Sequence, residues 1–305
     1  DCYVSFSDGT NTYTTGNLEG VNHGWVDVAS GSSLSGITSV TINSGSNAQG
    51  LSLKAIRVAG KDLVNSSVSL PNVPSIASTV RANQTAGFSI VSYTGNGTAG
   101  STIGHNLNSK PGLILLKSRD TQTSNQSWTV HHSAIAPTHN LVLNSAVGKN
   151  TTGSWNDTLP NSSTFTVGSA QVVNTDTKRY IAYCFAPVEG YSKFGSYEGG
   201  GTNNFIYTGF RPAFVLIKEA DNTNQWFMYD HTRDPSNDVD ASILWANSSN
   251  SEGTIGPGDN SSQAALDLLS NGFRITSNFT GINRSSSTFV YACFASHPFK
   301  TARAR

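Results

Sequence analysis

The sequence predicts an all-β protein, and three observations support this. β-Branched and aromatic residues cluster between turn residues, whereas strong helix formers are scarce and Met occurs once. Turn signals such as "TGNG", "SNG" and "NTDTK" recur roughly every ten residues, as they do in β-sandwiches. A segment of about 100 residues is also written twice. We therefore expect a small N-terminal β domain followed by two tandem, duplicated, jelly-roll-like β-sandwich repeats.

The N-terminal domain is expected over residues 1–75, which do not match the repeat. Its strands are expected at "YVSF", "GWVDV", "SVTI" and "KAIRVAGKDLV", with "AGKD" as a hairpin turn and Trp25 as a core anchor. A stretch rich in Pro, Ser and Asn follows from residue 71 and offers little to bury. We expect residues 76–86 within it to be a linker.

The repeats are expected over residues 87–191 and 192–305. The pairs that match are "PGLILLK" with "PAFVLIK", Trp128 with Trp226, and "YIAYCFAPVEGY" with "FVYACFASHPFK". Both sets of alternating positions in these strands are apolar, so the strands should be central and covered on both faces. The only stretch with a helical pattern is "SSQAALDLLSNG", residues 261–272, for which we expect a turn or two of helix.

Cys184 and Cys293 occupy the same place in the two copies of the last strand. We expect both to be small buried residues rather than halves of a disulfide, because free cysteine is among the most buried residue types. Next to them, Ala182-Tyr183 of the first copy becomes Tyr291-Ala292 of the second. The ring therefore changes face between copies, and each core should be packed differently around it.

Charge and hydropathy exclude two classes of partner. The 19 basic and 19 acidic residues balance, and only 12% of the residues are charged, so no basic surface for nucleic acid is expected. No apolar run reaches the roughly 18 residues that a membrane-spanning helix needs, so membrane insertion is not expected. The chain opens at Asp1 without a basic, apolar leader, which fits a processed product or a part of a longer protein.

The succession "FGSYEGGG…FIYTGFRPAFVLIK…WFMYDHTRDPSNDVD…DLLSNGFRI…NRSSSTFVYACFASHPFK" resembles a module of tailed-bacteriophage virion proteins, particularly marine ones. The resemblance covers residues 87–300. It implies a non-enzymatic tail-fibre or tail-associated protein, synthesised in the bacterial cytoplasm and located on the virion. Implied partners are other virion subunits, a host-surface glycan or receptor, and further copies of the chain in a trimer. A capsid-decorating or head-fibre protein and a polysaccharide-degrading tailspike are the alternatives.

The candidate glycan-binding or receptor-binding residues are Trp155, Trp245 and His131. Both tryptophans lack a match in the other copy and stand among polar residues, as surface rings do, whereas the matched Trp128 and Trp226 are expected in the cores. His131 and His132 are adjacent on an expected strand and should point to opposite faces, so a shared metal ion is not expected.

The stretch "DHTRDPSNDVD" is the one candidate for calcium. Asp234, Asp238 and Asp240 offer carboxylates, but the glycine and closing glutamate of an EF-hand loop are missing. A structural alternative is that Asp230 pairs with Arg233 and that Asn237 ties the loop to its own backbone. No other cofactor is expected. No catalytic residues are expected either, because the few glutamates fall at turns and no nucleophile motif occurs.

Overall fold

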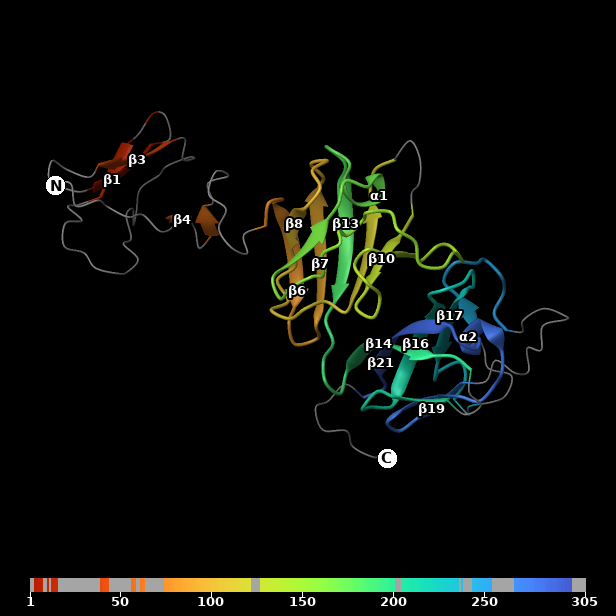
Figure 1. The fold of residues 1–305 in the computed structure, drawn as a ribbon. Helices are drawn as coiled ribbons and strands as arrows, with labels where there is room; N and C mark the ends of the chain where they lie inside the picture. The colour runs from red at the N-terminus through yellow and green to blue at the C-terminus, as the bar shows by residue number, and fades with distance from the viewer. Residues whose placement is uncertain are drawn as a thin grey trace. The chain divides into compact units, whose positions relative to one another are not determined.

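The computed structural model describes residues 3–7, 10, 12–15, 39–43, 56–58, 61–63, 74–121, 127–200, 204–235, 237, 243–253 and 266–297. The fold is all-β, as expected, with antiparallel sheets and two single-turn helices in the described part of the chain (Figure 1). The chain divides into two compact units, Asp1–Val68 and Ser69–Arg305.

The first unit contains a small antiparallel sheet of order β2-β1-β3 and a separate hairpin. The strands are β1 (Tyr3–Ser7), β2 (Thr12–Thr14) and β3 (Ser39–Asn43), and β4 (Ile56–Val58) pairs with β5 (Lys61–Leu63). Val4 and Phe6 alternate with more exposed neighbours and are buried. The expected strands "YVSF" and "SVTI" and the "AGKD" hairpin are confirmed, whereas "GWVDV" with Trp25 lies outside the described residues.

Repeat 1 is a sandwich of a six-stranded and a two-stranded sheet. The large sheet has the order β11-β10-β9-β13-β7-β6, and the small one pairs β12 with β8. A core of side chains such as Val91, Ile103 and Phe165 lies between them. The elements are β6 (Ser78–Asn83), β7 (Phe88–Thr94), β8 (Ser101–Gly104), β9 (Leu113–Ser118), β10 (Thr129–His132), β11 (Leu141–Val142), β12 (Thr164–Val167), α1 (Gln171–Asn174) and β13 (Arg179–Phe185).

Repeat 2 has the same plan, with a five-stranded sheet of order β14-β21-β16-β17-β18 facing a three-stranded sheet of order β15-β20-β19. Val215, Phe273 and Phe289 are in its core. The elements are β14 (Ser192–Glu198), β15 (Asn204–Tyr207), β16 (Pro212–Glu219), β17 (Trp226–Asp230), β18 (Leu244–Trp245), β19 (Leu266–Leu269), β20 (Gly272–Ile275), α2 (Thr280–Asn283) and β21 (Thr288–Ala295).

The duplication extends to individual hydrogen bonds. Tyr93 Oη donates to the Val173 carbonyl at 2.6 Å, and Tyr197 Oη donates to the Ile282 carbonyl at 2.7 Å. Each bond fastens a strand, β7 in repeat 1 and β14 in repeat 2, to the single-turn helix of that repeat. Asn174 and Asn283, which end those helices, bind backbone groups of the same loops in both repeats. The two tyrosine bonds are buried and join residues 80 and 85 positions apart, so they fix each helix against its sheet.

The tyrosine exchange between the copies is accommodated by its cross-strand neighbour. Tyr291 points into the core of repeat 2, where repeat 1 has Ala182, and it stands opposite Gly195, where repeat 1 has Val91. A Cβ added at Gly195 would lie 2.6 Å from Tyr291 Oη, so only glycine fits beside the ring. Each core is therefore repacked around the exchange, as the sequence predicts.

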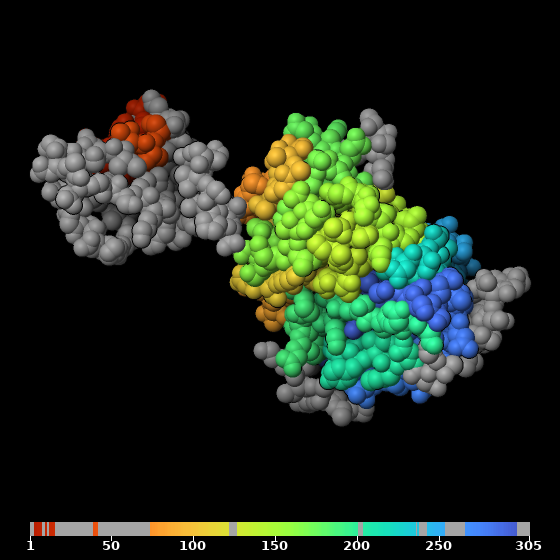
Figure 2. Space-filling view, in the orientation of Figure 1, coloured from red at the N-terminus to blue at the C-terminus, as the bar shows by residue number. Residues whose placement is uncertain are grey.

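A third core lies between the repeats, whose large sheets pack face to face. Val130 and Leu141 of repeat 1 are buried against Leu216, Trp226 and Val290 of repeat 2. The yellow-green atoms of repeat 1 and the cyan and blue atoms of repeat 2 meet directly in Figure 2. Repeat 1 and repeat 2 thus form one compact unit with three apolar layers rather than two separate domains.

Two expectations about local structure are wrong. Residues 78–83, expected in a linker at 76–86, form β6 and pair with β7, because Val80 points toward the core beside Val91. The helix expected within 261–272 is absent from the described residues 266–272, which instead form β19 and the start of β20. Leu266 and Leu268 alternate into the core, so the period is that of a strand.

Candidate binding site

Two of the three expected glycan-binding residues are buried. Trp155 is 2% exposed and packs in the core of repeat 1, and its ring lies edge-on to His131, with 5.6 Å between ring centroids. His131 is 1% exposed. The expected surface position of both residues is wrong, because the loop that carries Trp155 folds over the sandwich despite its polar sequence. Neither ring can stack on a sugar in the folded protein.

The two adjacent histidines point to opposite faces of the sheet, as expected from their spacing. His132 lies in the layer between the repeats, where Nε2–H donates to the Tyr291 carbonyl at 3.0 Å and Nδ1 accepts from the Ala134 amide. Burial lowers the pKa of His132 to about 4, although the carbonyl opposes the shift. Burial lowers the pKa of His131 to about 3, helped by the charges of His132 and Lys110. Both imidazoles are therefore neutral at pH 7.

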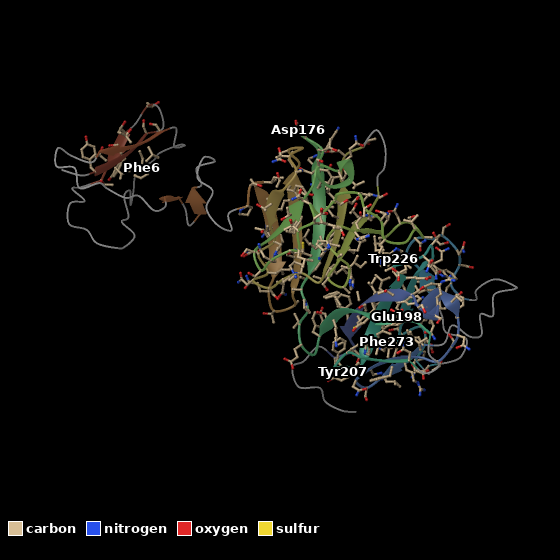
Figure 3. The ribbon with its side chains drawn as sticks, in the orientation of Figure 1. Phe6, Asp176, Glu198, Tyr207, Trp226 and Phe273 are labelled. Atoms are coloured by element: carbon tan, nitrogen blue, oxygen red, sulfur yellow. The ribbon has the colours of Figure 1, made fainter. Side chains whose placement is uncertain are left out.

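The matched tryptophans differ in burial although they occupy the same position. Trp226 lies in the layer between the repeats, where Nε1 donates to the Val142 carbonyl at 2.9 Å (Figure 3). Trp128 is half-buried on the outer face of the large sheet of repeat 1, with Lys117 Nζ 5.3 Å from its ring centroid. Trp245, the third expected glycan-binding residue, is half-buried on β18 and packs against the core of repeat 2.

The structural alternative for the acidic loop is supported by its contacts. Asp230 accepts from the backbone amides of Thr232 and Arg233 and pairs with the Arg233 side chain. Asn237 exchanges hydrogen bonds with the backbone of Leu268, so it ties the loop to β19 rather than to its own backbone. Asp234 is half-buried, while Asp238 and Asp240 lie outside the described residues. The described residues include no cluster of metal-ligating side chains.

A buried charged cluster lies at the seam between the repeats. Glu219 is fully buried, and its carboxylate accepts from Asn222, Asn224 and Arg284. Lys218 Nζ donates to the Ala146 carbonyl of repeat 1, and burial lowers the pKa of Lys218 to about 8. Both charged side chains are hydrogen-bonded to neighbouring groups of the protein. The cluster therefore joins the two repeats, and a substrate cannot reach it.

An open cleft lies beside the turn that joins the two repeats. It has a volume of about 350 Å³ and is lined by residues 187–190, 192–193 and 207–210. Tyr207 is 60% exposed and lies at the periphery of repeat 2 (Figure 3). Its neighbour on the same face of β15, Phe205, is 43% exposed. The strand turns both rings outward because Ile206, between them, fills the core.

The cleft combines an exposed ring with charges of both signs. Lys193 Nζ donates to the Tyr207 carbonyl at 2.8 Å and lies 5.3 Å from the centroid of the Tyr207 ring. Glu189 also lines the cleft and is exposed. A flat ring beside a cation and a carboxylate can hold a polar ligand with an apolar face, such as a sugar. None of the binding residues expected from the sequence is among the residues that line this cleft.

The fold and the cleft define a duplicated β-sandwich with an open cleft that charged and aromatic side chains line. The chain belongs to the family described as a domain of unknown function (DUF7483), whose model matches residues 39–298. No curated protein matches the chain, and no solved structure matches it. In the described part of the chain, no helix has the length and apolar character of a membrane span.

Proposed function

We propose that this chain is a non-enzymatic structural protein of a tailed-phage virion, a tail-fibre or tail-associated component on the particle surface that contacts a host-surface glycan or receptor. It is synthesised in the bacterial cytoplasm and assembles with other virion subunits. The resemblance of residues 87–300 supports the class of particle. The observation that carries the binding role is the open cleft beside Tyr207, with its exposed ring flanked by Lys193 and Glu189.

The composition of the cleft favours binding over cleavage. Glycoside hydrolysis uses a pair of carboxylates that flank the bond to be broken. Among the residues that line the cleft, Glu189 is the single carboxylate. The Glu219 carboxylate is fully buried and accepts hydrogen bonds from Asn222, Asn224 and Arg284. A polysaccharide-degrading tailspike is therefore the less favoured reading.

The binding role is tested with the full chain and polysaccharide extracted from the host surface. Tyr207→Ala should weaken binding about tenfold, equivalent to about 1.4 kcal/mol for the lost ring contact, and leave the melting temperature unchanged. The matched control is Tyr13→Ala, which removes a 39% exposed ring from the first unit. Equal binding by the two variants would show that the cleft beside Tyr207 is not the binding site. Release of reducing ends by the wild type would establish the tailspike instead.

The place on the particle is tested separately. Antibodies against the chain should decorate tails of intact virions, and the purified chain should compete with virions for adsorption to cells. Decoration of the head without competition would favour the alternative of a capsid-decorating or head-fibre protein.

A further inference from the structure

The packing between the two repeats is not symmetric, although both repeats use the outer face of the large sheet. One row of cross-strand neighbours crosses this face in each repeat: Ile90, Tyr183, Leu115, Val130 and Leu141 in repeat 1, and Phe194, Ala292, Leu216, Met228 and Leu244 in repeat 2. The buried ends of the two rows are opposite. In repeat 1 the β10 and β11 end is buried, and in repeat 2 the β14 and β21 end is buried.

The contact is therefore heterologous, meaning that two different patches of equivalent sheets meet. In each repeat, the half of the outer sheet face that is left uncovered is equivalent to the half that is buried in the other repeat. Repeat 1 retains an open face formed by Ile90, Lys117, Trp128, Ile181 and Tyr183, with Ile90 36% exposed. Repeat 2 retains the complementary loop face, formed by Ala213, by the side chains of Met228 and Leu244 and by the backbone of residues 245–249, while the Trp245 ring packs against the core of repeat 2. A heterologous contact can be repeated with a further copy, giving a ring or a filament.

Two donors on the open face show what would cover it. Within the chain, the equivalent donors of repeat 2 are satisfied by a loop of repeat 1: Trp226 Nε1 donates to the Val142 carbonyl, and Lys218 Nζ donates to the Ala146 carbonyl. Trp128 and Lys117 hold the same positions in repeat 1. Among the residues that the structure describes, Trp128 Nε1 and Lys117 Nζ have no hydrogen-bond acceptor, although Lys117 contacts the Trp128 ring.

Repeat 2 carries a loop of the same form as the one that satisfies these donors. After β11, the Leu143 amide donates to the Trp128 carbonyl and the Ser145 amide to the Val142 carbonyl. After β18, the Ala246 amide donates to the Trp226 carbonyl and the Ser248 amide to the Trp245 carbonyl. Asn144 and Asn247 both accept from the backbone amide of the matched tryptophan. The carbonyls of Trp245 and Ser249 thus correspond to those of Val142 and Ala146.

At the centre of the contact, the pair of side chains within the chain and the equivalent pair on the two free faces fill a similar combined volume. Within the chain, Phe194 presses on Gly112, where an added Cβ would lie 2.7 Å from the Phe194 ring. The equivalent pair on the free faces is Ile90 with Ala213. Ile90 is smaller than Phe194, and Ala213 is larger than Gly112. One contact is not repeated: His132, which donates to the Tyr291 carbonyl, is replaced by Asp230. Strand β6 also extends the open face by Arg81, next to Ile90.

We propose that the open face of repeat 1 binds the loop face of repeat 2 in a second copy of this chain, head to tail. The loop at Trp245–Ser249 of one copy covers Trp128 and Lys117 of the next. A closed ring of three such copies would agree with the trimer that the resemblance to phage tail proteins implies. The inference goes beyond the proposed function, because it concerns a different surface and stands whether or not Tyr207 binds a glycan.

The test is sedimentation velocity of the full chain at rising concentration. We expect the 32.2 kDa chain to give species of at least twice its mass. Ile90→Lys and Leu244→Lys should each sediment as monomers, whereas an equal mixture of the two should form dimers, because one intact pair of faces remains. The matched control is Leu159→Lys, which changes a 42% exposed leucine elsewhere on repeat 1 and should associate like the wild type.

Other outcomes would overturn the proposal. Association of Leu244→Lys alone, with loss only in Ile90→Lys, would show a symmetric contact between two open faces. A wild type that stays monomeric would leave no second copy to cover the face. If either lysine variant fails to fold, hydrogen exchange of the wild type decides: residues 88–94 and 244–249 should both gain protection as concentration rises, and unchanged exchange would contradict the proposal.

Discussion

His132 makes the packing of the two repeats sensitive to pH. It lies in the layer between them, and burial lowers its pKa from the ordinary 6.5 to about 4. Below pH 6.5 the unfolded chain binds a proton at this imidazole that the folded chain does not, so the free energy of unfolding falls as the pH falls. The loss ends near pH 4, where the folded protein also binds the proton. The difference in pKa corresponds to about 3 kcal/mol in total, or about 1.4 kcal/mol per pH unit.

The perturbation that tests this is His132→Gln, assayed by urea unfolding of the full chain at several values between pH 6 and pH 5. Glutamine retains an N–H donor for the Tyr291 carbonyl but does not titrate. The dependence of unfolding free energy on pH should become shallower by about 1.4 kcal/mol per pH unit, while the contribution of His131 remains. The control His297→Gln makes the same substitution at an exposed imidazole. A wild-type slope in His132→Gln would refute the reasoning.

Three further predictions concern the cores. Gly195→Val should lower the free energy of unfolding by about 2 kcal/mol because it collides with Tyr291, and adding Tyr291→Ala, which recreates the pair of repeat 1, should recover most of this loss in a urea titration. Asn283→Ala should cost about 2 kcal/mol in the same assay, because the Gly200 amide and the Ser277 carbonyl lose their partner; an unchanged midpoint would contradict the role given to this side chain. Cys184 and Cys293, whose thiol pKa values burial raises to about 12, should be alkylated by iodoacetamide only after unfolding, as measured by peptide mass; rapid labelling of the native protein would contradict their burial.

The sequence predicts the parts of this fold that depend on local patterns. Alternating apolar residues, turn signals and the written repeat are sufficient for the all-β class and for matching Cys184 with Cys293, both of which are free and buried. Residues 266–269 show the limit of such patterns. Leu266 and Leu269 fit one side of a helix, Leu266 and Leu268 fit one side of a strand, and the pairing of Leu268 with Phe273 decides between them.

The candidate site is much less predictable, because exposure depends on what packs on a residue from elsewhere in the chain. Trp128 and Trp226 match in sequence, yet repeat 1 covers only the second of them. Trp155 stands among polar residues but is buried by the fold of its loop. The cleft at Tyr207 is assembled from two segments, 187–193 and 207–210, so no single motif indicates it.

Photo-crosslinking from the open face tests the head-to-tail contact between copies, which repeats the heterologous packing seen within the chain. A benzophenone amino acid replaces Trp128 in the full chain, and isotopically light and heavy chains are mixed so that contacts between copies can be identified. We expect a crosslink between copies to the peptide that contains Trp245 to Ser249. Absence of a crosslink between copies, or a crosslink to Asp1–Val68 of the same chain, would contradict it.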